Sequence, residues 1–300
     1  MLKANGSRRQ FMQKTLKIAI LDLYDNAPNE GMRCIFKLIN QFGENEQIEI
    51  ETKIFNVRAN YEIPDLSYDI YFSSGGPGSP LASTEAWEKP YFEFIDSVFE
   101  YNKSKEAING ESSKKYMFLI CHSFQLVARH LGIGKITKRK STAFGVFPVN
   151  QTDKNIKEEL FEGLPEPFYV VDSRDYQLVS PNLKRIKDLG ITVLRMEKER
   201  PLVNLERAIM AIRFSDEVFG TQFHPEADGI GMSKYLSGEE KKKIVIKTHG
   251  LEKYNDMIDK LDDPDKILLT ESIIIPRFLK KAFVARESQL ARETLSYIIG

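Results

Sequence analysis

The first half of this chain alternates short apolar runs with stretches in which apolar residues recur at helical spacing. Leu16–Leu23 is an apolar run that ends in a turn signal, and apolar residues from Met32 to Ile39 then follow the period of a helix. Further strands are expected over Ile48–Val57, Tyr68–Phe72 and Tyr116–Ile120, and helices over Trp87–Phe99 and Gln125–Leu131. This βαβα order predicts an α/β fold, in which helices cover both faces of a mostly parallel sheet.

The segment from residue 142 to residue 226 has shorter strand candidates that follow one another closely. They are Phe144–Val149, Phe168–Val171, Ile191–Met196, Ala208–Phe214 and Val218–Phe223. Close spacing leaves no room for crossover helices, so these strands are predicted to add to the sheet in antiparallel or mixed fashion.

The composition changes after Glu226. From Ser237 onward the chain is rich in Lys and Glu and has helical periodicity, broken at Gly250 and at Asp262-Asp263-Pro264. We therefore expect three parts: a disordered or loosely packed tail over residues 1–15, an α/β domain over 16–228, and a helical extension over 229–300 that packs on the core.

Composition excludes several classes of function. Lys plus Arg and Asp plus Glu both total 43, so the chain has no net field to attract nucleic acid or an anionic membrane. No apolar run is long enough to cross a bilayer. The two cysteines, Cys34 and Cys121, do not make a disulfide framework and predict a cytoplasmic protein with reduced thiols. No residues have the spacing of metal ligands, and no cofactor is implied.

Cys121 directly follows the strand candidate Tyr116–Ile120 and precedes a helix. A nucleophile at such a turn is held clear of the sheet, and the helix N-terminus favours negative charge there. The thiolate is the reactive form of cysteine. The alternative is that Cys121 is a small buried residue, as free cysteines often are.

A second signal is the pair His224 and Glu226, which ends the strand candidate Val218–Phe223. Alternate residues of a strand share a face, so the carboxylate can orient the imidazole. Alone, this pair is typical of a surface histidine beside a turn. With Cys121 it supplies a nucleophile, a base and an orienting group, which is the combination that acyl transfer requires.

The third signal is the glycine-rich loop Ser73–Pro80, which follows a strand candidate. Glycines let backbone N–H groups approach a ligand closely, as an oxyanion requires. The amide of His122, next to the nucleophile, is the natural second donor. No Gly-Lys-Ser/Thr follows the loop, so it is not a typical phosphate loop.

Together these residues resemble the class I glutamine amidotransferases, the family of the GMP synthase and anthranilate synthase glutaminases. The resemblance covers roughly residues 16–228 and rests on the Ser-Gly-Gly-Pro-Gly-Ser loop, the Cys121 segment ending in Gln125, and Phe223-His224-Pro225-Glu226. It implies a three-layer α/β/α sandwich around a flavodoxin-like sheet. It also implies hydrolysis of the glutamine side-chain amide through a γ-glutamyl thioester, with release of ammonia.

The resemblance also implies roles for individual residues. Cys121, His224 and Glu226 would form a catalytic triad, and Gly76 and His122 would line the oxyanion hole. The substrate-binding residues would be Gly75, Gln125, Ser173 and Arg174.

Three positions depart from the family pattern. The family elbow reads Gly-x-Cys-x-Gly-x-Gln, whereas this chain has Leu119 and Ser123 at the two glycine positions. Ser173-Arg174-Asp175-Tyr176 stands where many members have Ser-His-x-Asp, a segment that grips the α-amino and carboxylate groups of glutamine. Arg174 can pair with a carboxylate, and an altered γ-glutamyl substrate is also possible.

The Cys121-His122 dipeptide also resembles the intracellular protease/deglycase family. That family lacks the late His-Pro-Glu segment, so proton transfer is assigned to His224 and not to His122.

Three functions remain open. The first is an amidotransferase that passes ammonia to a partner synthase, since no synthase module is recognisable. The second is a stand-alone γ-glutamyl hydrolase or peptidase. The third is a catalytically silent homologue that uses its cleft for binding.

Overall fold

The computed structural model describes residues 15–109, 113–200, 202, 204–259, 261 and 263–299. The expected tail over residues 1–15 lies almost wholly outside the described residues.

A nine-stranded sheet forms the centre of the protein, in the order β2-β1-β3-β4-β9-β8-β7-β5-β6. The strands are β1 (Leu16–Asp22), β2 (Ile50–Asn56), β3 (Ile70–Ser73), β4 (Tyr116–Ile120), β5 (Lys135–Gln151), β6 (Phe168–Val179), β7 (Thr192–Glu197), β8 (Ile209–Arg213) and β9 (Val218–Thr221). The first five in spatial order pair in parallel, and every pair from β9 to β6 is antiparallel. The predicted fold class, a flavodoxin-like parallel core with antiparallel additions, is confirmed.

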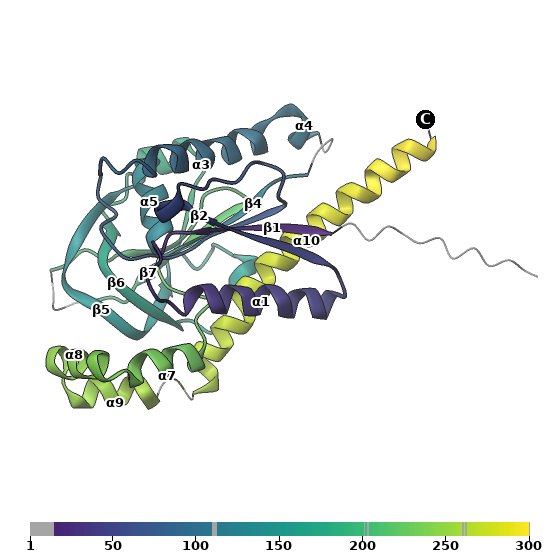
Figure 1. Ribbon diagram of the computed structural model, residues 1–300. Helices are drawn as coiled ribbons and strands as arrows, with labels where there is room; N and C mark the ends of the chain where they lie inside the picture. The colour runs from purple at the N-terminus through teal and green to yellow at the C-terminus, as the bar shows by residue number, and fades with distance from the viewer. Residues whose placement is uncertain are drawn as a thin grey trace, which may run out of the picture.

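Helices cover both faces of this sheet (Figure 1). One layer contains α1 (Gly31–Glu46) and α10 (Leu269–Ile299), and the other contains α3 (Glu88–Lys103) and α5 (His122–His130). Shorter elements are α2 (Val57–Asn60), α4 (Lys105–Ile108), the 3₁₀ turn η1 (Glu159–Phe161), α6 (Leu183–Asp188) and the π-helical turn η2 (Pro264–Leu268). None of the helices within the described ranges combines the length and the apolar character that crossing a membrane requires.

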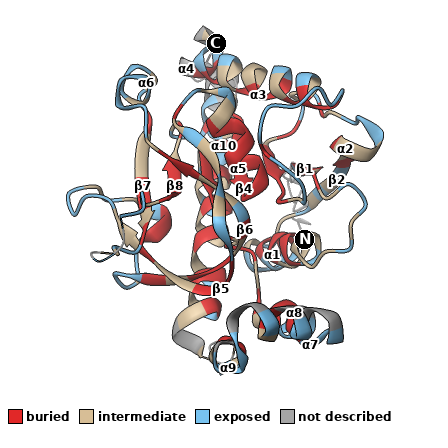
Figure 2. Ribbon diagram, turned by 90° about the vertical axis from the view of Figure 1, so that its left-hand side faces the viewer, coloured by how far each residue is buried: buried red, intermediate tan, exposed pale blue. Residues whose placement is uncertain are grey.

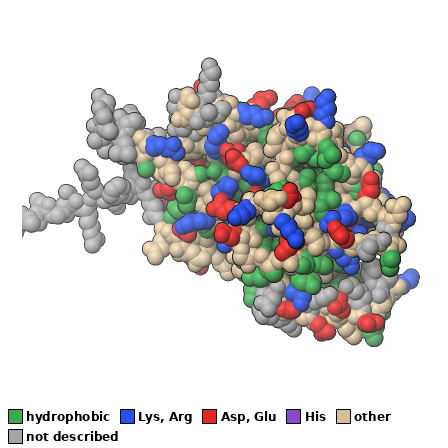
Figure 3. Space-filling model, turned by 180° about the vertical axis from the view of Figure 1, so that it is seen from behind, with side chains coloured by type: hydrophobic (Ala, Val, Ile, Leu, Met, Phe, Trp, Pro, Cys, Tyr) green, Lys and Arg blue, Asp and Glu red, His purple; other side chains and the backbone are tan. Residues whose placement is uncertain are grey.

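Two apolar cores lie on opposite faces of the sheet, because successive side chains of each buried strand point to opposite faces. Ile18 and Ile20 of β1 contribute to the core under α1 and α10, whereas Ala19 and Leu21 contribute to the core under α3 and α5. Figure 2 shows the buried residues gathered along the central strands and on the inner sides of these helices. On the face that Figure 3 shows, acidic and basic side chains intermingle and do not form a region of one sign.

A small helical group, α7 (Gly229–Ser237), α8 (Glu239–His249) and α9 (Leu251–Asp259), packs against the β5–β6 ribbon. Met232, Leu236 and Met257 contact Phe144 and Val146 in a third apolar cluster. These three helices therefore lie next to β5, below it in the view of Figure 1.

The strands β5 and β6 are much longer than the apolar runs that predicted them. Periodicity indicated only Phe144–Val149 and Phe168–Val171, but the pairing continues to Lys135 and Val179. The extra residues are mostly polar, and a register shift between Lys138 and Ala143 interrupts the alternation. Hydrogen bonds between the strands hold this part of the ribbon, so hydropathy alone did not reveal it.

The first prediction concerns Phe278 of α10. Its fully buried ring lies 5.1 Å from the ring of Phe118 and 5.7 Å from that of Phe72, centroid to centroid. Phe278→Ala should lower the free energy of unfolding by about 3–5 kcal/mol, because it leaves a cavity between α10 and the sheet. Denaturant unfolding measures this. Val284→Ala, at an exposed position of α10, is the control and should change stability by no more than about 0.5 kcal/mol.

Candidate active site

The sequence-predicted residues meet at one edge of the sheet. β1, β3, β4 and β9 are parallel, so their carboxyl ends lie side by side. Tyr24, Gly75, Cys121 and His224 each follow the end of one of these strands. In open α/β sheets this edge is where ligands bind.

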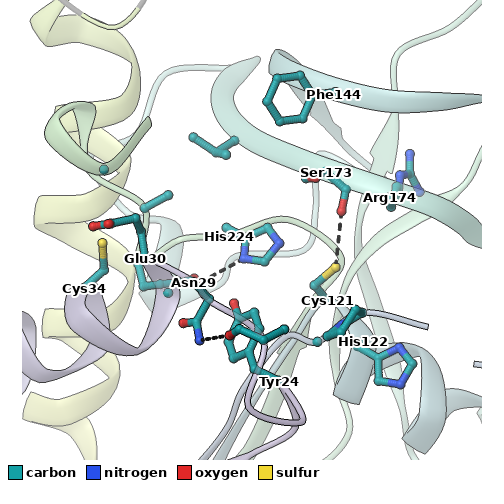
Figure 4. Close-up of a pocket in the computed structure, with 18 of the residues that line it drawn as sticks. Tyr24, Asn29, Glu30, Cys34, Cys121, His122, Phe144, Ser173, Arg174 and His224 are labelled. Carbon is teal, nitrogen blue, oxygen red and sulfur yellow. Dashed lines mark hydrogen bonds and ion pairs between the residues drawn. The ribbon is translucent and has the colours of Figure 1, made fainter. Parts of the chain in front are cut away.

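Cys121 occupies the single-residue turn between β4 and α5, and its backbone is left-handed, with φ 50° and ψ −96°. A non-glycine residue rarely adopts this conformation, and holding it costs about 1–3 kcal/mol. The turn is anchored on both sides: the Cys121 N–H donates to the Thr221 carbonyl at 2.7 Å, and the Gln125 N–H donates to the Cys121 carbonyl at 3.1 Å. The thiol is thereby directed into a cavity (Figure 4).

The two departures from the elbow pattern fit this turn. The Ser123 hydroxyl accepts a hydrogen bond from the Ile120 N–H at 2.8 Å and donates to the Ser73 carbonyl at 2.7 Å. Ser123 therefore joins the elbow to the glycine loop. Leu119 is fully buried opposite Gly220 of β9, and a Cβ at Gly220 would lie 3.2 Å from the Leu119 Cβ. The missing side chain at 220 thus makes room for the leucine.

His224 and Glu226 are in contact: His224 Nδ1 and Glu226 Oε1 are 2.8 Å apart. The His224 N–H donates to the Val171 carbonyl at 2.9 Å, which fixes the backbone of the histidine against β6. Burial alone would lower the pKa of His224. The charges of Glu226 and Cys121, with hydrogen bonds to both, outweigh burial and hold that pKa well above its usual range. The imidazolium form is therefore favoured beside the thiol.

The glycine loop is held against the end of β1. The Ser74 N–H donates to the Leu21 carbonyl at 3.0 Å, and the Arg58 guanidinium donates to the Pro77 carbonyl at 2.6 Å. Glycine is required at two places. A Cβ at Gly75 would lie 3.0 Å from Cε1 of His224, and one at Gly76 would lie 2.3 Å from the Leu23 carbonyl oxygen. The loop therefore approaches both the histidine and the end of β1 more closely than a side chain allows.

His122 is the first residue of α5, so its amide has no acceptor within the helix. Its ring points away from the cavity (Figure 4) and is only 3% exposed. Burial, together with the nearby charges of Arg58 and Arg129, lowers the pKa of His122 to about 3. The ring is therefore neutral, and it points away from the cavity that the thiol enters.

Three further residues named from the sequence border the same cavity: Gln125, Ser173 and Arg174. The Gln125 amide donates to the Tyr176 carbonyl at 3.0 Å, and the Ser173 carbonyl accepts from the Cys121 thiol at 3.7 Å. The Arg174 side chain is only 1% exposed, and its guanidinium is held by Asp172 at 3.0 Å and Glu197 at 2.8 Å. The structure thus commits Arg174 to internal carboxylates.

Two residues that the sequence did not single out belong to this site, whose cavity has a volume of about 420 Å³. Gln222 donates to the Cys121 sulfur at 3.7 Å, and its side-chain oxygen accepts from Gln125 at 2.8 Å. The partly buried Tyr24 lies below His224 (Figure 4); burial and then the charge of Glu226 raise its pKa well above the usual value. Gln222 follows the end of β9 and Tyr24 follows the end of β1, and these positions were the signal that the sequence offered for a place in the site.

No group of three or more His, Cys, Asp or Glu side chains among the described residues is arranged to hold a metal ion.

Comparisons with known proteins identify the family and the fold. Residues 34–239 match the family Glutamine amidotransferase class-I. The chain belongs to the class I glutamine amidotransferases. The sequence has no significant match among curated proteins.

Solved structures with the same fold include two glutamine amidotransferases. That from Thermotoga maritima is 12% identical with a TM-score of 0.62, and the match covers 90% of this chain and 98% of that protein. That from Methylobacillus flagellatus is 13% identical with a TM-score of 0.55, and the match covers 92% and 95%. A Thermoplasma acidophilum protein, assigned as part of a GMP synthase, is 15% identical with a TM-score of 0.50, and the match covers 92% and 98%.

The second prediction follows from the buried, neutral ring of His122 in this amidotransferase-family protein. Between pH 6.5 and pH 3 the His122 ring is protonated in the unfolded chain but neutral in the folded one. The free energy of unfolding therefore falls as pH decreases through this window. The His122→Asn variant should remove up to about 1.4 kcal/mol of this loss per pH unit. Denaturant unfolding from pH 7.5 to pH 4 measures the slope, and the pH 7.5 value isolates the packing change. A variant with the parent slope would contradict the assignment of a buried neutral ring.

The third prediction tests the packing at Gly220. A Cβ there would lie 2.9 Å from ring atoms of both Phe124 and Phe214. Gly220→Ala should therefore cost about 1–3 kcal/mol of unfolding free energy. In a double-mutant cycle with Phe214→Leu, Gly220→Ala should lower the free energy of unfolding by less than it does in the parent. The difference should be at least roughly 0.5 kcal/mol. Strict additivity would show that the clash is not the cause.

Proposed function

We propose that this protein is a glutamine amidotransferase that hydrolyses the side-chain amide of glutamine through a γ-glutamyl thioester. Cys121 is the nucleophile, His224 the general acid and base, and Glu226 the group that orients the imidazole. The observation that carries the proposal is the 2.8 Å contact between His224 and Glu226 at the cavity into which the strained Cys121 turn directs its thiol.

In the first half-reaction the Cys121 thiolate attacks the amide carbon, and a C–S bond forms. The carbonyl oxygen becomes an oxyanion, for which the amides of Gly76 and His122 are the proposed donors. The His224 imidazolium gives its proton to the departing nitrogen, the C–N bond breaks, and ammonia leaves. The charge of Glu226 favours the imidazolium that this step consumes.

In the second half-reaction water attacks the thioester while neutral His224 accepts one of its protons. The C–S bond breaks, glutamate leaves, and Cys121 and His224 return to their starting forms. Gln125, with Ser173, borders the space for the γ-glutamyl group, and Gly75 lies against His224 beside it. Gln222 is added to this set because it contacts both the sulfur and Gln125.

The ammonia acceptor is proposed to lie on a partner synthase. The structural neighbour assigned as part of a GMP synthase supports an arrangement in which glutaminase and synthase are separate chains. The partner would then activate an acceptor for the ammonia that Cys121 chemistry releases.

A second candidate is a hydrolase or peptidase that acts alone on a larger γ-glutamyl compound. The guanidinium of Arg174 is enclosed by Asp172 and Glu197, so within the described structure this arginine is not a free cation for the carboxylate of glutamine. Phe144, Cys34 and Met232 also line the cavity, whose volume of about 420 Å³ leaves space for a group beyond the scissile amide.

The fourth prediction tests the three catalytic roles. Cys121→Ser should abolish turnover of glutamine, and His224→Ala and Glu226→Gln should each reduce kcat by roughly 10²–10⁴-fold. Glu226→Gln removes the charge that raises the pKa of His224, so the alkaline limit of activity should move to lower pH. Ammonia release across pH measures both effects, with the exposed Glu93→Gln as the matched control. Equal alkylation of Cys121 by a glutamine-like electrophile in parent and His224→Ala would support a silent homologue.

The substrate comparison separates the two candidates. Glutamine, a γ-glutamyl dipeptide and a γ-glutamyl alkylamide are offered at equal concentrations, and both glutamate and the released amine are measured. Glutamine turnover supports the amidotransferase, whereas cleavage of the larger compounds with glutamine inert supports the hydrolase.

A further inference from the structure

A second cavity, with a volume of about 440 Å³, lies across β6 from the candidate active site. Ser173, Arg174 and Asp175 border the first cavity and Asp172 borders the second, whereas Thr142 and Phe144 of β5 border both. The residues around the second cavity are Arg139, Ser141, Thr142, Ala143, Phe144, Phe147, Pro148, Asp172, Glu197, Lys198, Arg200 and Met210. Nothing in the proposed glutaminase reaction uses this cavity.

Three guanidinium groups converge on one carboxylate beside this cavity. Glu197 Oε1 is 3.0 Å from Arg139 Nη1, 2.8 Å from Arg174 Nη2 and 3.1 Å from Arg200 Nη2. Asp172 supplies the second carboxylate. Three cations thus meet two anions, and the exposed Lys198 adds a further positive charge at the rim.

The charges in this group are not fully satisfied within the described residues. Asp172 Oδ1 and Arg174 Nη1 are buried and have no hydrogen-bond partner there. Burial, and then the charge of Arg174, lower the pKa of Arg139. Both groups are ion-paired through their other atoms, but a buried polar atom without a hydrogen bond is costly, so a network that served stability alone would be expected to satisfy these two atoms as well. The group also has four cations, Arg139, Arg174, Arg200 and Lys198, and only the two carboxylates of Glu197 and Asp172, so an anion in the cavity would balance the remaining positive charge.

We propose that the second cavity binds a small doubly charged anion and that β6 transmits its occupancy to Cys121. The excess of four cations, Arg174 included, over two carboxylates selects a doubly charged ligand. The volume limits the ligand to a small molecule, and the apolar side chains of Pro148 and Met210 fit a short carbon skeleton. A phosphate ester and a dicarboxylate share this chemistry.

The coupling follows from the two sides of β6. On the first side, the Ser173 carbonyl contacts the Cys121 thiol and the Val171 carbonyl holds the His224 backbone. On the second side, the intervening Asp172 and the adjacent Arg174 join the charge group. An anion that draws Arg174 or Arg139 toward itself therefore acts on the segment that positions the nucleophile and the base.

The first measurement is of binding, by calorimetry on the full chain. Inorganic phosphate and succinate distinguish the two sources of the dianion, and acetate at matched ionic strength is the singly charged control. At least one dianion should bind saturably, and Arg139→Gln and Arg200→Gln should each weaken binding roughly tenfold or more. Arg277→Gln, on α10 and outside the cavity, and Cys121→Ala, in the first cavity, should bind as the parent does.

The second measurement is the rate at which iodoacetamide alkylates Cys121, which does not require turnover. Saturating dianion should change this rate at least twofold in the parent and leave it unchanged in Arg139→Gln. If the arginine variants do not fold, the variant Lys198→Gln, at an exposed position, replaces them in both measurements. It should weaken binding severalfold. Binding no stronger than that of acetate, binding indifferent to Arg139 and Lys198, or an unchanged alkylation rate would each overturn the proposal. Because neither readout depends on glutamine, failure here is distinct from failure of the proposed reaction.

Discussion

The left-handed backbone at Cys121 is the constraint on which the arrangement of the site depends. It exists because β4 must end and α5 must begin within one residue, while the Thr221 carbonyl of β9 holds the Cys121 amide. This turn directs the thiol out of the sheet and leaves the amide of His122 at the start of a helix. Its cost of about 1–3 kcal/mol is offset by the buried cores on both faces of the sheet.

The two residues that depart from the family elbow pattern are accommodated by this turn. At position 123, where the family pattern has a glycine, the serine hydroxyl makes hydrogen bonds to Ile120 and Ser73. These bonds join the elbow to the glycine loop. A leucine at 119 is compatible with the turn because its neighbour on β9 is Gly220. The space that an elbow needs can be provided by the adjacent strand as well as by the elbow itself.

The sequence predicted most of what depends on local pattern. The sequence indicated β1, β4, α1 and the Cys121 turn. Their signals are the spacing of apolar residues and the position of Cys121 directly after an apolar run, and both are local in the sequence. The length of β6, the partners of Arg174 and the contact of Gln222 with Cys121 were not found. Each joins residues far apart in the chain, and polar residues buried by pairing leave no mark on hydropathy. An arginine was therefore interpreted as a ligand for substrate when its partners were two internal carboxylates.

The register of β6 determines which groups Arg174 contacts. On β6, Ser173 faces the nucleophile and Arg174 faces the charge group, so a slip of one residue would exchange them. Register is set against β5 by Ala143 opposite Arg174 and Phe144 opposite Ser173, immediately after the shift that follows Lys138. Apolar contacts of Phe144 and Val146 with α7 and α9 hold that register in place. The packing of the C-terminal helices on the ribbon therefore favours the register in which the Ser173 carbonyl meets Cys121.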